Sequence, residues 1–128
     1  MKTHVVITKE PLDESGLTKT RQISDGMGAV VLFLGVVRGQ EGPQSIQGLE
    51  YEAFEAMAHR QFQLIFEEIE RRWPIESIRL VHRVGFVATN ESSLWVEVIA
   101  PHRKEAFDAS QYLIDEMKKV VPIWKKVC

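Results

Sequence analysis

The segment Ala29–Val37, with the sequence AVVLFLGVV, restricts the fold of this 128-residue chain more than any other. Apart from Gly35, every residue of the segment is apolar, and β-branched and aromatic residues are frequent. Continuous apolar runs of this kind are typical of strands that are covered on both faces. We therefore expect a core strand covered on both faces here, with Arg38 at its mouth and a mobile polar turn over residues 38–45.

Other periodic patterns predict the remaining elements. Alternating or β-branched runs favour strands at His4–Thr8, Leu49–Phe54, Ser77–Val84 and Ser93–Ala100. Helical spacing of apolar residues favours helices over Ala58–Trp73 and His102–Val121, each ended by a proline. A weaker helix is expected between Asp13 or Ser15 and Ser24. This order of elements is typical of an α+β or mixed α/β fold.

The composition indicates one compact domain, residues 1–128, with 45% hydrophobic and 27% charged residues. The formal net charge of −2 provides no long-range field that would attract nucleic acid or an anionic membrane. No apolar run has the length of a membrane span. Cys128 is the single cysteine, so the chain forms no internal disulfide and no cysteine-based metal cluster. We expect a cytoplasmic protein.

Sequence signatures of nucleophilic-serine, nucleotide-binding and zinc enzymes are absent. The remaining candidates are cations at the ends of predicted elements, namely Arg38, His102, Arg103, Lys118 and Lys125. If they gather, they would bind phosphate or carboxylate, and crowding would lower the pKa of a lysine. Taken singly, Arg38, His102 and Arg103 are equally well explained as solvated or helix-flanking side chains. For Lys118 and Lys125, spacing alone favours a structural role near a helix C-terminus, where the dipole favours cations.

Two further basic residues, His82 and Arg83, lie in the middle of a predicted strand. At such a position a structural hydrogen bond or an interface role is favoured over catalysis.

Five segments together resemble the catalytic, or large, subunit family of molybdopterin synthase, from molybdenum-cofactor biosynthesis. They are GAVVLFLGVVR (28–38), LEYEAFEAMA (49–58), RWPIESIRLVHRVG (72–85), APHRKEAFDA (100–109) and MKKVVPIWKK (117–126). The resemblance spans about the whole chain, and its most specific motifs are PHR-x-x-AF and K-x-x-x-P-x-W-K. It implies an α/β hammerhead-like single domain of the α+β class, with a mainly antiparallel sheet and two principal helices.

The resemblance also implies an activity. The family's enzyme is a sulfurtransferase that converts cyclic pyranopterin monophosphate (precursor Z) to molybdopterin by inserting two sulfur atoms. The sulfur comes from the C-terminal Gly-Gly thiocarboxylate of a small ubiquitin-like sulfur-carrier subunit. Two large subunits form a central homodimer with a small subunit at each end, which makes a heterotetramer. No metal and no redox cofactor is expected, because the sulfur arrives already activated.

Matching by position implies the site residues. Lys118 and Lys125 are the catalytic candidates, and the spacing of the K-x-x-x-P-x-W-K motif selects Lys118 rather than Lys119. The implied substrate-binding residues are Arg38, His102, Arg103, Lys118, Lys125, Lys126 and Val127. His102 and Arg103 are expected to act across the dimer interface.

Two departures from the family pattern accompany the resemblance. The chain ends at Cys128, where many relatives continue, and the segment Glu41–Gln47 has little of the family's pattern, so a response to substrate is open there. Two alternative functions also stay open. One is a non-catalytic dimeric module that docks a ubiquitin-like protein or a phosphorylated metabolite. The other is a phosphoester hydrolase, against which the missing nucleophile and metal ligands argue.

Overall fold

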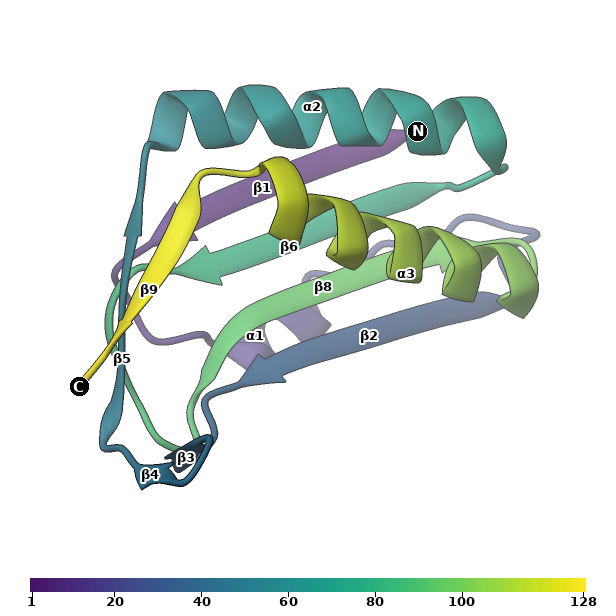
Figure 1. Cartoon of the computed structure of the whole chain (residues 1–128). Helices are drawn as coiled ribbons and strands as arrows, with labels where there is room; N and C mark the ends of the chain where they lie inside the picture. Colours follow the sequence, from purple (N-terminus) through teal and green to yellow (C-terminus); the bar gives the residue numbers. More distant parts are fainter.

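Four strands form the main sheet of the molecule (Figure 1). In spatial order they are β1 (Lys2–Thr8), β6 (Ser77–Arg83), β8 (Ser92–Ala100) and β2 (Ala29–Val36). β1 runs parallel to β6, and the other two pairings are antiparallel. The computed structural model describes all residues from 1 to 128. The mainly antiparallel α+β architecture predicted from the sequence is therefore confirmed.

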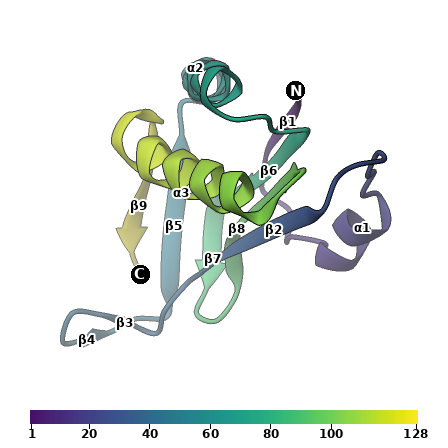
Figure 2. The ribbon, with the colours of Figure 1, turned by 90° about the vertical axis from the view of Figure 1, so that its right-hand side faces the viewer.

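Two long helices, α2 (Glu55–Arg72) and α3 (Arg103–Val120), cover one face of this sheet (Figures 1 and 2). Most of their apolar residues are buried; Phe62 and Ile69 of α2 and Leu113 of α3 have no exposed surface. They pack on inward-facing side chains of the sheet such as Leu80 and Val98. Each such side chain stabilises the fold by about 1.5–3 kcal/mol through burial alone. The two predicted principal helices are confirmed.

A smaller antiparallel sheet closes one end of the molecule. Its order is β7 (Gly85–Ala88), β5 (Gly48–Ala53) and β9 (Ile123–Val127). A short hairpin, β3 (Gln40–Glu41) and β4 (Gln44–Ser45), precedes β5 and turns at Gly42, whose φ of +61° favours glycine. This end of the fold holds the residues that follow β2 and α3.

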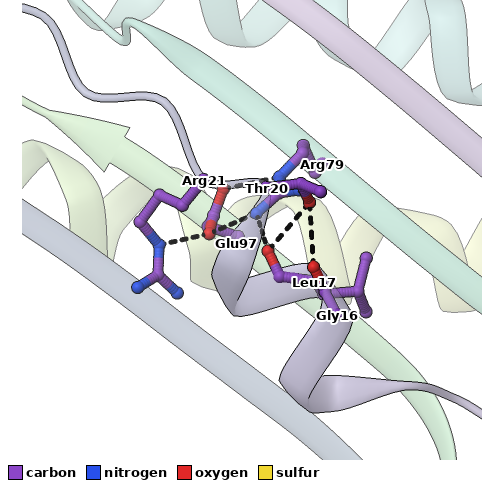
Figure 3. Close-up of polar contacts among 6 residues, drawn as sticks. All are labelled: Gly16, Leu17, Thr20, Arg21, Arg79 and Glu97. Carbon is purple, nitrogen blue, oxygen red and sulfur yellow. Dashed lines mark hydrogen bonds and ion pairs between the residues drawn. The ribbon is translucent and has the colours of Figure 1, made fainter.

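A short helix, α1 (Glu14–Lys19), lies on the face of the main sheet opposite the long helices (Figure 3). Beside it, Glu97 of β8 is only 1% exposed and accepts hydrogen bonds from Arg21 Nε at 2.6 Å and Arg79 Nε at 2.8 Å. Burial alone would raise the pKa of Glu97, but the hydrogen bonds and charges of the two arginines outweigh it and lower that pKa. Arg79 also lies over the ring of Trp95, at 5.0 Å from its centroid.

β2 forms an edge of the main sheet, beyond β8, and one of its two faces is not covered. Ala29, Val31 and Phe33 pack against the core under the helices. The alternating residues on its other face are 37–50% exposed, namely Val30, Leu32, Leu34 and Val36. The prediction of a strand covered on both faces is wrong for the single chain. An apolar run indicates that both faces of a strand are kept from water. It does not indicate whether the second face is covered by residues of the same chain or by another molecule.

The ends of the chain also differ from expectation. Asp13 does cap α1, since its side chain accepts from the Gly16 N–H at 3.0 Å, but the helix ends at Lys19 rather than near Ser24. Helix α1 buries no residue, so no packing extends it. The tail after Pro122 is a strand, β9, paired along its length with β5. β7 was also not anticipated from the sequence.

Candidate functional site

A cavity of about 530 Å³ opens between the end of β2, the end of α3 and strand β9. Three cations line it, Arg38, Lys118 and Lys125, and no carboxylate does. Its remaining walls are largely apolar, with Phe33 and Trp124 among them. A concave, mostly apolar cavity with convergent cations suits an anionic ligand that also carries an apolar or ring portion.

Arg38 is placed by the segment that follows β2. The preceding residue, Val37, is 2% exposed, and its N–H donates to the Glu91 carbonyl at 2.9 Å. The Val37 carbonyl in turn accepts from the Asn90 N–H at 2.7 Å. Because both backbone groups of Val37 are anchored, the residue after it has little freedom. The expectation that Arg38 stands at a strand mouth is confirmed.

Lys118 and Lys125 approach the cavity from two sides of a chain reversal. Lys118 is in the last turn of α3, beside Met117, which is buried in the core. The helix ends before Pro122, and β9 then carries Lys125 into register with Tyr51 of β5. The seven-residue spacing of the two lysines therefore brings them to one cavity because a proline ends the helix between them.

A buried histidine lines the same cavity. His82 of β6 is 6% exposed, and its Nδ1 lies 2.7 Å from the Arg83 carbonyl oxygen. The ring of Tyr51 packs edge-on against the imidazole, with 5.2 Å between the ring centroids. Burial lowers the pKa of His82, and the hydrogen bond to the Arg83 carbonyl opposes this shift.

The hydrogen bond that the sequence favoured for His82 is thus present, but its place in the cavity was not anticipated. A signal was available in the strand pattern. Residues 78, 80 and 82 of β6 point to the core side, and His82 is the polar member of that set. A histidine whose side chain points inward near the end of a strand is a candidate for lining an internal cavity.

His102 and Arg103 do not line this cavity. They lie at the beginning of α3, sixteen and fifteen residues before Lys118, which corresponds to about 24 Å along the helix for His102. His102 is exposed, and its Nδ1 lies 3.2 Å from Glu105 Oε1. Within one chain these two residues are therefore remote from the three cations.

Lys126 and Val127 are exposed on β9 and are also absent from the cavity wall. Side chains alternate along a strand, so Lys126 points away from the side on which Lys125 lies. Cys128 is exposed as well. No group of three or more His, Cys, Asp or Glu side chains is placed to hold a metal ion. A smaller cavity of about 150 Å³, near β1 and β6, contains none of the predicted site residues.

Comparisons with known proteins agree on one family. The family model described as "MoaE protein" matches residues 7–120 of the chain. The molybdopterin synthase catalytic subunit 1 of Aedes aegypti is 44% identical over 103 residues, which are 80% of this chain and 66% of the mosquito protein. The catalytic subunit of Bacillus subtilis is 38% identical over 120 residues, 94% of this chain and 76% of that protein. The chain thus spans just under two thirds of the mosquito relative.

Solved structures give the same result. The crystal structure of molybdopterin synthase from Staphylococcus aureus superposes with a TM-score of 0.86 at 36% identity, covering 98% of this chain and 89% of that one. A complex of subunits 1 and 2 of molybdopterin-converting factor from Helicobacter pylori 26695 superposes with a TM-score of 0.79 at 25% identity, covering 98% and 83%. No helix of the present structure combines the length and apolarity that crossing a membrane would require.

Proposed function

The chain belongs to the MoaE protein family, as its sequence indicated, and we propose that it is the catalytic subunit of a molybdopterin synthase. In this proposal it inserts two sulfur atoms into cyclic pyranopterin monophosphate. The donor is the C-terminal thiocarboxylate of a small ubiquitin-like sulfur-carrier subunit. We propose that the reaction takes place in the cytoplasm.

The observation that supports this proposal most is the convergence of Arg38, Lys118 and Lys125 in a cavity without carboxylates. Both reactants are anions, a phosphate and a thiocarboxylate. Two unit charges 4 Å apart interact by about 4 kcal/mol at an effective dielectric constant near 20, so their approach is opposed unless cations offset the repulsion. We assign Lys118 to the thiocarboxylate, and Arg38 and Lys125 to the phosphate as its ring opens.

The entrance of the cavity supports the arrival of a chain terminus. Trp124 lines the cavity and packs edge-on against Phe54, with 5.1 Å between the ring centroids. Both side chains are partly exposed, so they form an apolar surface that adjoins the cavity through Trp124. A Gly-Gly terminus has no side chains to exclude it from such a cavity. The Helicobacter pylori chain that shares this fold belongs to a complex of two different subunits. This favours a small-subunit partner here.

The exposed edge of β2 supports a homodimer in which His102 and Arg103 act on the partner's cavity. The start of β2 is next to the start of α3, since the Gly28 N–H donates to the Pro101 carbonyl at 3.1 Å. The end of β2 leads to Arg38 and the cavity. If two copies meet along this strand about a two-fold axis, the start of one β2 faces the end of the other.

The dimensions agree with this arrangement. β2 has eight residues and spans about 27 Å, close to the distance of about 24 Å that separates His102 from Lys118 along α3. A two-fold contact that includes this face of β2 would also cover its exposed apolar side chains. We propose that each complete site combines one chain's cavity with the other chain's His102 and Arg103.

The test is reconstituted sulfur insertion. The purified protein is mixed with cyclic pyranopterin monophosphate and a thiocarboxylated carrier, and the dithiolene product is followed by mass spectrometry. We expect wild type to form product and Lys118→Ala to lose about 100-fold or more of the rate while it still binds the carrier. Lys119→Ala is the matched control, because Lys119 is the adjacent residue, exposed and paired with Glu116 at 3.0 Å.

Other outcomes would identify the alternatives. Carrier binding without any product from wild type would indicate a non-catalytic docking module. Turnover of the substrate in the absence of carrier would indicate a phosphoester hydrolase. Equal activity of the Lys118 and Lys119 variants would remove Lys118 from the chemistry.

A further inference from the structure

Among the side chains that line the cavity, His82 alone carries an imidazole. The other titratable residues of the lining are Arg38, Tyr51, Lys118 and Lys125, and no carboxylate is among them. Guanidinium and ammonium groups are hydrogen-bond donors without an acceptor atom, whereas a neutral imidazole has one acceptor nitrogen. His82 is therefore the side chain of the lining that is best suited to accept a proton.

The hydrogen bond of His82 determines which ring nitrogen is available. A carbonyl oxygen can only accept, so the contact of 2.7 Å to the Arg83 carbonyl requires the proton on Nδ1. The lone pair is then on Nε2. Nε2 has no hydrogen-bond partner in the chain. The side-chain atoms that are both buried and without a partner are Arg21 Nη2 and Arg83 Nε, so Nε2 is not among the buried atoms. Nε2 is therefore accessible, and the space that its ring lines is the cavity.

Neighbouring residues hold the imidazole in this orientation. Tyr51 packs against the ring, and its hydroxyl donates to Ser93 Oγ at 3.2 Å. Ser93 Oγ donates in turn to the Gly35 carbonyl at 3.3 Å. Residues from three strands of two sheets, β5, β8 and β2, thus hold one ring in place, as expected for a proton acceptor that must keep one direction.

The surroundings of this ring disfavour its charged form. Lys118 from α3, Lys125 from β9, Arg38 after β2 and Tyr51 from β5 line the same cavity, whereas the Arg83 guanidinium on its own strand pairs with Glu91 at 3.2 Å. Burial lowers the pKa of His82 below its ordinary value, and the hydrogen bond to the Arg83 carbonyl opposes this shift. The imidazole therefore loses its proton more readily than that of an exposed histidine.

We propose that His82 is the general base for the water that releases the sulfur carrier, an inference that rests on the sulfur-insertion function proposed above. When the thiocarboxylate sulfur bonds to a carbon of the substrate, a carbon–oxygen bond at that carbon breaks and the oxygen leaves with the electron pair, while the sulfur is still bonded to the acyl carbon of the carrier. The two molecules are then joined as a thioester. Turnover requires water to break that acyl–sulfur bond, because the carrier cannot leave otherwise.

The step balances with water as the only co-reactant. His82 Nε2 takes one proton from the water as its oxygen bonds to the acyl carbon, and the cations of the cavity stabilise the oxyanion. The acyl–sulfur bond then breaks, and the electron pair leaves with sulfur as a thiolate on the substrate. The carrier departs as a carboxylate. The second proton of the water and the proton held by His82 both pass to solvent. No atom is oxidised or reduced.

The test separates formation of the thioester from its hydrolysis. Wild type and His82→Asn are mixed with substrate and thiocarboxylated carrier in a single turnover, and intact-mass spectrometry follows the carrier–substrate adduct. Asparagine retains an N–H for the Arg83 carbonyl but has no ring nitrogen to accept a proton. We expect adduct to form at a near wild-type rate in the variant and to decay about 100-fold more slowly. His59→Asn, on the exposed surface of α2, is the matched control.

Each result has a distinct meaning. Adduct decay at the wild-type rate in His82→Asn would overturn the role of His82 while leaving sulfur insertion intact. Absence of both adduct and product in wild type would overturn the proposed function itself, and this inference with it. If His82→Asn does not fold, the wild-type pH profile decides. The decay rate should rise with pH to a plateau within about pH 5–8, with its midpoint below the ordinary histidine pKa, and a flat profile would overturn the proposal.

Discussion

Lys125 lies opposite Tyr51 in the register between β9 and β5, so a backbone ladder fixes its place at the cavity. The next residue, Lys126, lies opposite Glu50 and outside the cavity wall. Two adjacent lysines on one strand thus have different surroundings. They offer a matched pair for testing which surface of β9 meets the substrate.

We expect Lys125→Ala to lower kcat/KM for sulfur insertion about 10- to 100-fold, because it removes a charge-assisted contact to the substrate phosphate. Lys126→Ala should keep most of the activity. Steady-state kinetics with varied substrate measures both, and thermal unfolding checks that neither variant is destabilised. A larger loss in Lys126→Ala than in Lys125→Ala would show that the substrate meets the other side of β9.

The proposed two-chain site predicts complementation between inactive variants. Lys118→Ala and Arg103→Ala, purified separately, should each be impaired. Co-expressed with different tags and purified as a mixed dimer, they should recover about half the wild-type activity per dimer. One cavity in that dimer contains neither substitution, because its Lys118 and the partner's Arg103 are both intact. The measurement is product formation per dimer.

A second mixed dimer provides the control. One chain carries both substitutions, Lys118→Ala and Arg103→Ala, and its partner is wild type. If Arg103 acts on the partner's cavity, both sites of this dimer are defective. If Arg103 acted within its own chain, the wild-type chain would keep one full site, and activity would be recovered here instead.

The sequence predicted the local structure of β2 well and its position poorly. An apolar run shows that both faces avoid water, but not that Val30, Leu32, Leu34 and Val36 are left exposed by their own chain. Whether that second face is covered depends on how the chain assembles with others, and the strand propensity of the segment does not determine it. Long-range pairing likewise explains β9, which local propensity does not predict. It forms because β5, some seventy residues earlier, offers a free edge.

For the cavity, too, the sequence predicts where each residue lies along its element but not how the elements come together. Arg38, Lys118 and Lys125 could each be placed at the end of an element from the sequence, because a polar turn and a proline mark those ends. Their convergence depends on long-range strand pairing, which spacing does not encode. The strand position of His82 predicts a structural hydrogen bond but not a place in the cavity, because the cavity exists only once β9 pairs with β5.

The buried carboxylate on the other face of the sheet gives a prediction about stability. Glu97→Gln leaves Arg21 and Arg79 without their anionic partner, although both arginines are largely buried. Breaking a buried ion pair from one side costs about 3–5 kcal/mol. Urea unfolding at pH 7 should therefore show a lower midpoint for Glu97→Gln, whereas Glu67→Gln, on the exposed surface of α2, should unfold like wild type.

The same group makes wild-type stability depend on pH, with a definite sign. The pKa of Glu97 is lower in the folded chain than its ordinary value of about 4.3, so the folded state favours the ionised form. Its contribution to the free energy of unfolding is complete above that ordinary value and is lost as the pH falls through the folded-state pKa. The difference in stability between wild type and Glu97→Gln should accordingly be largest at neutral pH and shrink in acid. Urea titrations at several pH values measure it, and a gap that widened in acid would contradict the assignment.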